Sequence, residues 1–264
     1  MLFVVVVENN LVMHFQKLLA LVLSNLINKD SKILFNRNPA ERVQKVAPWL
    51  TLDGNVYPAV VNGKITWILD GYTTNSGYPY SKRINLADAT TNSLTTSSAA
   101  VVPLPNRTVN YIRNSVKATV DAYDGTVTLY KWDENDPVVN TWAKAFPGTL
   151  HNKSEMSAGL LSHIRYPEDL FGVQRDVLST YHVENAGAFY GGQDFWRVPT
   201  DPSSIGANNG VQPPYYTTMQ MPGAKTSAFS LTTAFVPKGN RQNLTAFAAV
   251  NSDFGPDYGK ISVL

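Results

Sequence analysis

Carboxylate and tyrosine side chains offer the most chemistry in this 264-residue chain, and they fall in two stretches. Residues 70–80 (DGYTTNSGYPY) carry Asp70, Tyr72, Tyr78 and Tyr80, in what we expect to be a loop after a strand. Tyrosine combines a flat apolar ring with a polar hydroxyl, which suits carbohydrate or peptide ligands. The same side chains can instead cover the edge of a core, so both interpretations stay open.

The second stretch contains Glu168, Asp169 and His182, in and just beyond residues 167–181 (PEDLFGVQRDVLSTY). With His163 nearby, these residue types suggest a metal site. However, ligands on one helix need a spacing such as i and i+4, and a proline separates His163 from the acidic pair. A helix with acids in its first turn and a histidine after its end explains the pattern as well. We favour that helix and predict neither a metal nor a cofactor.

No motif identifies a reaction or a catalytic residue. The chain has no cysteine, no Gly-x-Ser-x-Gly elbow and no phosphate-binding Gly-Lys-Ser/Thr sequence. A hydrolase or transferase that uses two carboxylates, such as Asp70 with Glu168 or Asp169, needs them about 5 to 9.5 Å apart across a cleft. A sequence does not supply that separation. An enzyme therefore remains the alternative to a non-enzymatic binding or structural module.

Composition narrows the possible partners. Apolar residues make up 44% of the chain, which is enough for a real core at this length. The formal net charge is +2, and no stretch concentrates lysine or arginine. Nucleic-acid binding needs such a basic surface, so we predict no nucleic-acid partner.

Two β-hairpins are predicted from turn sequences between apolar runs. Residues 57–69 surround Asn62-Gly63, and residues 116–130 surround Asp124-Gly125. Either dipeptide suits a two-residue type I′ turn, which matches the twist of antiparallel strands. Residues 88–105 (DATTNSLTTSSAAVVPLP) follow the first hairpin, and we expect a flexible loop there.

Helices are predicted in the middle of the chain and strands again at its end. Asp136 and Pro137 are suited to begin a helix that runs through Phe146. Further helices are expected over residues 39–45, 154–164 and 167–181, and strands over 215–221, 229–235, 246–251 and 260–264. The predicted fold class is α+β, with antiparallel hairpins and a central helical insert.

No run of residues is long enough to span a bilayer. Residues 11–27 predict an apolar helix, but the uncharged run within residues 18–28 has only eleven residues. A membrane-spanning helix needs about 20. We therefore expect a helical segment over residues 1–28 and a separate α+β domain over 29–264.

Several blocks of sequence resemble one family, uncharacterised protein family 0182. The blocks follow the family's order and cover nearly everything from residue 31 onward. They are residues 46–53 (VAPWLTLD), 60–80 (VVNGKITWILDGYTTNSGYPY), 110–130, 146–148, 163–182, 215–223 (YYTTMQMPG), 229–233 (FSLTT) and 250–264 (VNSDFGPDYGKISVL).

The resemblance implies a bacterial membrane protein with several transmembrane helices followed by a large extracytoplasmic domain. This chain resembles a fragment of that domain, with residues 1–28 as the remnant beside the membrane region. The implied location is the cell membrane, with this domain outside it. The implied partners are the membrane, through helices outside this chain, and a cell-envelope component or protein. The family has no agreed activity, so it assigns no catalytic residue.

Overall fold

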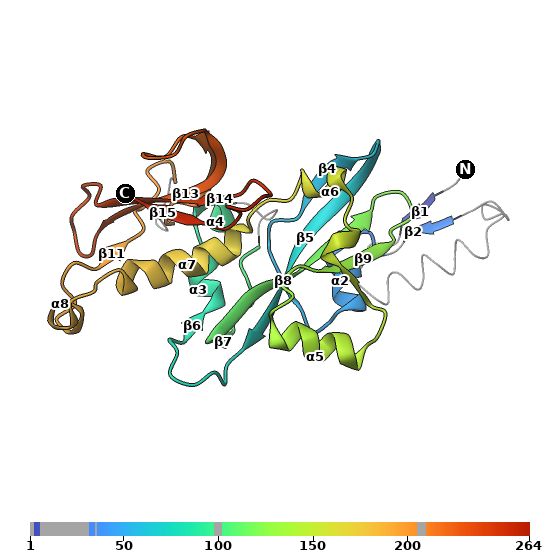
Figure 1. The fold of residues 1–264 in the computed structure, drawn as a ribbon, viewed down its shortest axis with the longest axis horizontal. Coiled ribbons are helices and arrows are strands. Elements are labelled where there is room, and N and C mark those ends of the chain that lie inside the picture. Colours follow the sequence, from blue (N-terminus) through green and yellow to red (C-terminus); the bar gives the residue numbers. More distant parts are fainter. Residues whose placement is uncertain (1–2, 6–31, 35, 98–101, 205–209) are drawn as a thin grey trace.

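A computed structural model describes residues 3–5, 32–34, 36–97, 102–204 and 210–264 of the chain. Helices and mostly antiparallel sheets alternate along it, which confirms the predicted α+β class. Two main sheets lie side by side along the long axis of the molecule, and the long helix α7 runs beside the second sheet (Figure 1).

The first sheet holds both predicted hairpins and has the strand order β10-β9-β8-β5-β3, with β4 also paired to β5. Its two longest strands, β5 and β8, pair antiparallel along almost their whole length. The strands are β3 (Thr51–Leu52), β4 (Tyr57–Val61), β5 (Lys64–Asn75), β8 (Tyr111–Asp121), β9 (Val127–Lys131) and β10 (Leu150–Asn152).

The two hairpin turns differ from each other. Asn62 and Gly63 both have positive φ angles, of 51° and 79°, so the predicted two-residue turn between β4 and β5 is confirmed. The prediction of the same turn between β8 and β9 is wrong, because five residues, 122–126, connect those strands. There the Asp121 carboxylate accepts hydrogen bonds from two loop N–H groups, and only Gly125 has a positive φ angle.

Helices cover both faces of the first sheet. Helices α2 (Pro39–Val46) and α5 (Pro137–Ala145) pack on one face through Val43 and Val139. Asp136 caps α5 as predicted, since its carboxylate accepts from the N–H groups of residues 138 and 139. The other face packs against α6 (Ala158–Leu161), which is shorter than the helix predicted over 154–164. The 3₁₀ turn Lys153–Glu155 ends before it, and Ser157 begins α6 as its N-cap.

The second sheet packs against α7 (Glu168–Tyr181) through Phe171, Leu231 and Phe235. Helix α7 begins and ends within one residue of its predicted bounds. A short helix, α8 (Ala186–Tyr190), follows α7. The strands of the sheet are β11 (Trp196–Arg197), β12 (Tyr215–Met219), β13 (Ala228–Pro237), β14 (Ala246–Asn251) and β15 (Ile261–Val263), so the four predicted C-terminal strands are confirmed.

Part of the loop predicted over residues 88–105 is helical. Helices α3 (Leu86–Thr90) and α4 (Ser93–Ser97) occupy its first half, next to the short paired strands β6 (Ile84–Asn85) and β7 (Thr108–Val109). The prediction of an irregular loop is wrong there, because Thr and Asn side chains satisfy the short helices' own backbone groups. The flexibility of the segment stays a prediction.

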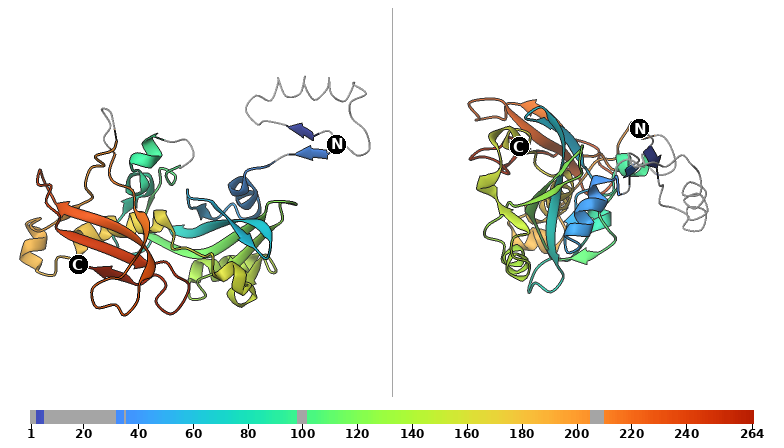
Figure 2. Two further views of the ribbon diagram at one scale, coloured as in Figure 1. Left: turned by 90° about the horizontal axis from the view of Figure 1, so that it is seen from above. Right: turned by 90° about the vertical axis from the view of Figure 1, so that its right-hand side faces the viewer.

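The predicted helix over residues 11–27 lies outside the described residues. Within the segment 1–28 that was predicted to be helical, residues 3–5 form a strand instead: β1 (Phe3–Val5) pairs in parallel with β2 (Lys32–Leu34), at one end of the molecule (Figure 2). Among the described residues, none of the helices has the length and apolar character needed to cross a bilayer.

Candidate functional site

The segment between β3 and β4 meets the first turn of α7. The Asp53 carboxylate accepts hydrogen bonds from the N–H of Asn55, at 2.7 Å, and from the N–H of Asp169, at 3.2 Å. It also accepts from the hydroxyl of Tyr72 on β5. The residue before α7 is Pro167, whose side chain cannot cap the helix. Asp53 therefore satisfies a first-turn N–H that would otherwise lack an acceptor.

Helix α7 returns these contacts. One Asp169 carboxylate oxygen accepts from the N–H of Gly54 at 2.7 Å, and the N–H of Leu170 donates to the Tyr72 hydroxyl at 3.2 Å. We call the hydrogen-bonded group Asp53, Tyr72 and Asp169 the carboxylate junction. A side chain at Gly54 would meet the carbonyl oxygen of Val102 at 2.0 Å, so the close approach of this loop to the chain at Val102 requires glycine.

Burial controls the protonation of the junction. It raises the pKa of Asp53 to about 6, with the nearby Asp70 carboxylate acting in the same direction. Burial and the Asp53 carboxylate raise the pKa of Asp169 well above its usual value. Hydrogen bonds to both groups oppose these shifts, but desolvation outweighs them. Burial in the junction therefore favours the protonated forms of the Asp53 and Asp169 carboxyl groups.

Asp70 forms a separate buried ion pair behind the junction. It lies directly opposite Lys117 in the β5–β8 register, and the two side chains pair with 3% and 0% of their surface exposed. Asn114 donates to Asp70 at 2.8 Å. Lys117 also donates to the carbonyl of Arg165 at 3.0 Å and to the hydroxyl of Tyr258 at 3.1 Å. Both charges thus have several partners, as a buried pair requires.

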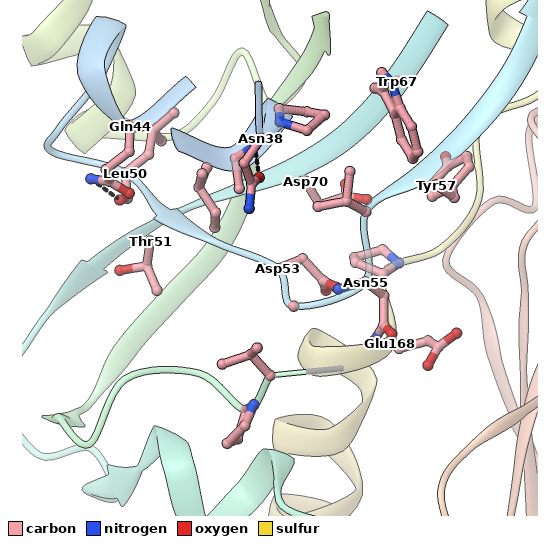
Figure 3. A pocket seen from close by; sticks show the side chains of 18 of the residues that line it. Asn38, Gln44, Leu50, Thr51, Asp53, Asn55, Tyr57, Trp67, Asp70 and Glu168 are labelled. Atoms are coloured by element: carbon pink, nitrogen blue, oxygen red, sulfur yellow. Dashed lines mark hydrogen bonds between the residues drawn. The ribbon is translucent and has the colours of Figure 1, made fainter. Parts of the chain in front are cut away.

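A groove with a volume of about 1380 Å³ opens beside the junction. Aromatic rings of Tyr57, Trp67 and Tyr216 line it together with Asn55 and Glu168. Glu168 lies beside Asn55 in Figure 3, with Tyr57 and Trp67 farther along the groove. Asp53 and Asp70 also line the groove, although each is at least 96% buried by surrounding atoms.

Glu168 is a half-buried carboxylate of the groove, which the exposed Glu41 also lines. Burial and the Asp53 carboxylate raise its pKa to about 7, although the Arg165 guanidinium opposes the shift. The described residues give its carboxylate no hydrogen bond or ion pair within 4 Å. The Arg165 guanidinium lies 4.6 Å from the ring centre of Tyr57 and 5.6 Å from that of Tyr216. The arginine thus holds two of the groove's aromatic rings by cation–π contacts.

The structure brings together four of the seven residues selected from the sequence: Asp70, Tyr72, Glu168 and Asp169. Asp70 and Tyr72 are not in a loop as predicted, because β5 continues through Asn75 by pairing with β8 across a bulge at Gly71/Tyr72. The Tyr72 ring is fully buried.

The other three selected residues lie elsewhere. Tyr78 and Tyr80 are exposed beyond the end of β5, where Tyr78 stacks on Tyr111. His182 caps the C-terminal end of α7, about 21 Å from the helix start at 1.5 Å per residue over 14 residues. Its two ring nitrogens face the carbonyl oxygens of Leu178 and Asp194, so it has a structural role there.

Sequence analysis did not select Asp53, Lys117, Arg165 or the groove rings. Asp53 is the last residue of the block 46–53, which resembles the family, so the sequence did contain a signal for this residue. Lys117 and Arg165 gave none, because their roles depend on strand register and on contacts across the fold. Within the part of the chain that the structure describes, no group of three or more His, Asp or Glu side chains is arranged to hold a metal ion.

The fold and site define an α+β domain whose two sheets meet at buried carboxylates beside an aromatic groove. The chain belongs to Uncharacterised protein family (UPF0182), whose model matches residues 10–264, and the resemblance inferred from the sequence is confirmed.

Relatives with the same family name are similar over nearly the whole chain. A UPF0182 protein of Thermobifida fusca is 60% identical over 245 residues, which cover 92% of this chain and 24% of the relative. A UPF0182 protein of Streptomyces coelicolor is 56% identical, over 91% of this chain and 24% of the relative. One of Bifidobacterium adolescentis is 53% identical, over 91% and 23%. The chain spans about a quarter of the length of these relatives. No solved structure matches it.

Proposed function

We propose that this chain is a non-enzymatic binding module of the bacterial cell envelope and that the groove takes a polar envelope component, a glycan or peptide. The observation that carries the proposal is the lining of the groove, where Tyr57, Trp67 and Tyr216 accompany Asn55 and Glu168. Aromatic rings offer flat apolar area to sugar rings or peptide side chains, and amide and carboxylate groups select hydroxyl or N–H groups.

The extracytoplasmic location is part of the same proposal. It is supported by the family resemblance, which implies transmembrane helices outside this chain and this domain beyond the cytoplasmic membrane. In that arrangement the partners are the membrane, through those helices, and an envelope component held in the groove.

The state of the carboxylates favours binding over catalysis. Asp53, Asp70 and Asp169 are each at least 94% buried, and each accepts hydrogen bonds or an ion pair from the protein itself. Two-carboxylate hydrolysis needs a second acid or base that reaches the substrate. In the described groove Glu168 is available for that role, while its carboxylate neighbour Asp53 already accepts three hydrogen bonds.

An envelope hydrolase or transferase is the second candidate, on one observation. The raised pKa of Glu168, about 7, suits a general acid near neutral pH. This function requires the junction to open so that Asp53 reaches a substrate. Release of reducing ends or free amines from purified envelope material, lost in Glu168→Gln, would establish it and would contradict the non-enzymatic proposal.

Cosedimentation with purified, insoluble cell-wall material tests the binding proposal. Asn55→Ala is a clean groove variant, because the Asn55 side chain makes no hydrogen bond to the described residues. Trp67→Leu removes a groove ring. We expect the unchanged chain to cosediment and both variants to lose at least about tenfold in affinity.

Tyr80→Ala is the matched control, since it removes a fully exposed ring outside the groove. Each variant must show the far-ultraviolet circular dichroism of the unchanged chain. Equal binding by all four proteins, or loss in Tyr80→Ala alone, would remove the groove from the account.

A further inference from the structure

A second cavity, of 360 Å³, lies between α3, α7 and β11 and is separate from the groove. Its lining includes Arg175 from α7, Trp196 from β11 and the hydroxyl-bearing residues Thr91, Ser179 and Thr200. Thr91 and Ser179 donate their hydroxyls to helix carbonyls, which leaves their oxygens able to accept but not to donate. The Thr200 hydroxyl can donate to a ligand, and the buried side-chain donors of the lining are Arg175 and Trp196.

Arg175 is a buried cation that forms no ion pair with the described residues, although the charges of Asp176 and Asp169 act on it. Only 3% of its surface is exposed, and burial lowers its pKa to about 10, so it stays charged at neutral pH. The described residues give its guanidinium one hydrogen bond, from Nη1 to the carbonyl of Gln212 at 2.8 Å, and no ion pair. Asp176, its neighbour in sequence, pairs instead with Lys82 at 3.1 Å. A buried charge in this state is costly unless an anion joins it.

Trp196 supplies a second donor in the same cavity. Its indole Nε1 is buried and has no acceptor among the described residues. The ring stacks on His182, with 3.4 Å between ring centres, and packs on Phe235 at 5.3 Å. These contacts hold the ring in place. A buried donor without an acceptor among the described residues calls for a partner.

Three other charged groups line the cavity. Arg197 donates to the carbonyls of Gly239 and Arg241, at 3.0 and 3.1 Å. Asp88 is exposed, so solvent screens its charge. Asp176 lies in the lining too and pairs with Lys82. Arg175 is therefore the buried cation of the cavity, and Trp196 carries its buried neutral donor.

We propose that this cavity binds an oxyanion, a phosphate or carboxylate group, through the guanidinium of Arg175 and the indole N–H of Trp196. A planar guanidinium can donate two parallel hydrogen bonds to either group, and an indole N–H donates a third. The site is independent of the function proposed for the groove.

Calorimetric titration of the 264-residue chain with inorganic phosphate, and separately with acetate, tests the proposal at an ionic strength matched with sodium chloride. We expect saturable binding of at least one anion, and the arm that saturates identifies the group. Trp196→Phe keeps the stacked ring but removes the N–H, so affinity should fall about tenfold. Arg175→Met should abolish binding.

Trp49→Phe is the control, because Trp49 lies outside the cavity and stacks on Trp142. It should bind like the unchanged chain. If Arg175→Met fails to fold, the comparison of Trp196→Phe with Trp49→Phe still decides. Absence of saturation by both anions, or unchanged affinity in Trp196→Phe, would overturn the proposal.

Discussion

Two regions along α7 differ in how completely their polar groups are satisfied. At its first turn, Asp53, Tyr72 and Asp169 exchange hydrogen bonds with backbone N–H groups from both sides of the contact. At the middle of the helix, Arg175 has a single hydrogen bond to the described residues, and the indole N–H of Trp196, which lines the same cavity, has none. Both regions are buried, so the difference lies in the partners available and not in exposure.

The comparison separates stability from binding. Groups whose hydrogen bonds are complete within the protein hold the two sheets together, and their loss should lower the free energy of unfolding. Groups left incomplete have capacity for a ligand, and their loss should affect binding more than folding. The aspartates beside the groove already have partners within the protein. The ligand that we propose for the groove should therefore contact Asn55 and Glu168 instead.

The largest effect is expected from Lys117→Met. The substitution leaves the Asp70 carboxylate buried without its cation, which costs about 3–5 kcal/mol in the free energy of unfolding. Urea unfolding followed by circular dichroism measures it. Lys260→Met removes an exposed ion pair with Asp257 and should change the free energy by less than about 0.5 kcal/mol. A loss below about 1 kcal/mol in Lys117→Met would show that Asp70 is solvated.

A pH-dependent stability follows from Glu168. Its folded-state pKa, about 7, lies above the ordinary value of 4.5, so the folded protein favours the protonated form. That contribution is fully present below pH 4.5 and is lost as the pH rises through 7. Asp53, with a pKa of about 6, adds a loss in the same direction. The unfolding free energy should therefore fall between pH 4.5 and 7.

Glu168→Gln removes one of these two contributions. The variant should match the unchanged chain at pH 4 and exceed its unfolding free energy by about 3 kcal/mol at pH 8. Arg165 and Asp169, which also face Glu168, remain in both proteins. Glu184→Gln, at an exposed acid, should show no such difference. Equal pH profiles for the Glu168→Gln and unchanged proteins would mean that Glu168 is freely solvated.

A smaller effect is expected from Tyr72→Phe. The substitution keeps the buried ring but removes the hydroxyl that donates to Asp53 and accepts from the N–H of Leu170. The free energy of unfolding should fall by about 1–3 kcal/mol, the cost of leaving buried partners unsatisfied. Tyr80→Phe alters an exposed hydroxyl and should be neutral. A neutral Tyr72→Phe would contradict the junction.

The smallest change in stability is expected from Trp196→Phe without an anion present. The variant loses a buried N–H that has no partner among the described residues, which favours folding, and some ring area, which opposes it. The net change in the free energy of unfolding should stay within about 1 kcal/mol. A loss above about 2 kcal/mol would show that the N–H already has a partner within the protein.

Local features of the fold were predictable from the sequence. Asn62-Gly63 predicts its turn because few residues adopt two successive positive φ angles. Asp136 followed by Pro137 predicts the start of α5 because both residues suit the first turn of a helix. Glu168 and Asp169 predict the start of α7 because acidic residues suit the first turn of a helix. The bounds of that helix are predicted within one residue.

The site was predictable only in part. Glu168 and Asp169 belong to a helix start that the sequence shows, but the partner of Asp169 is Asp53, 116 residues away. Lys117 opposes Asp70 because of the β5–β8 register, which alternation alone does not determine. Arg175 and Trp196 meet only when α7 packs against β11. Contacts of this kind depend on tertiary packing, which propensity and periodicity do not encode.

The most direct test of the difference between the first turn of α7 and the Arg175 cavity is urea unfolding of Tyr72→Phe and Trp196→Phe, each with and without saturating phosphate. We predict that Tyr72→Phe lowers the midpoint equally in both buffers and keeps the phosphate-induced increase, whereas Trp196→Phe keeps the midpoint in plain buffer and loses most of that increase. Loss of the increase in Tyr72→Phe, or its full retention in Trp196→Phe, would contradict the assignment of stability to the first turn and binding to the cavity.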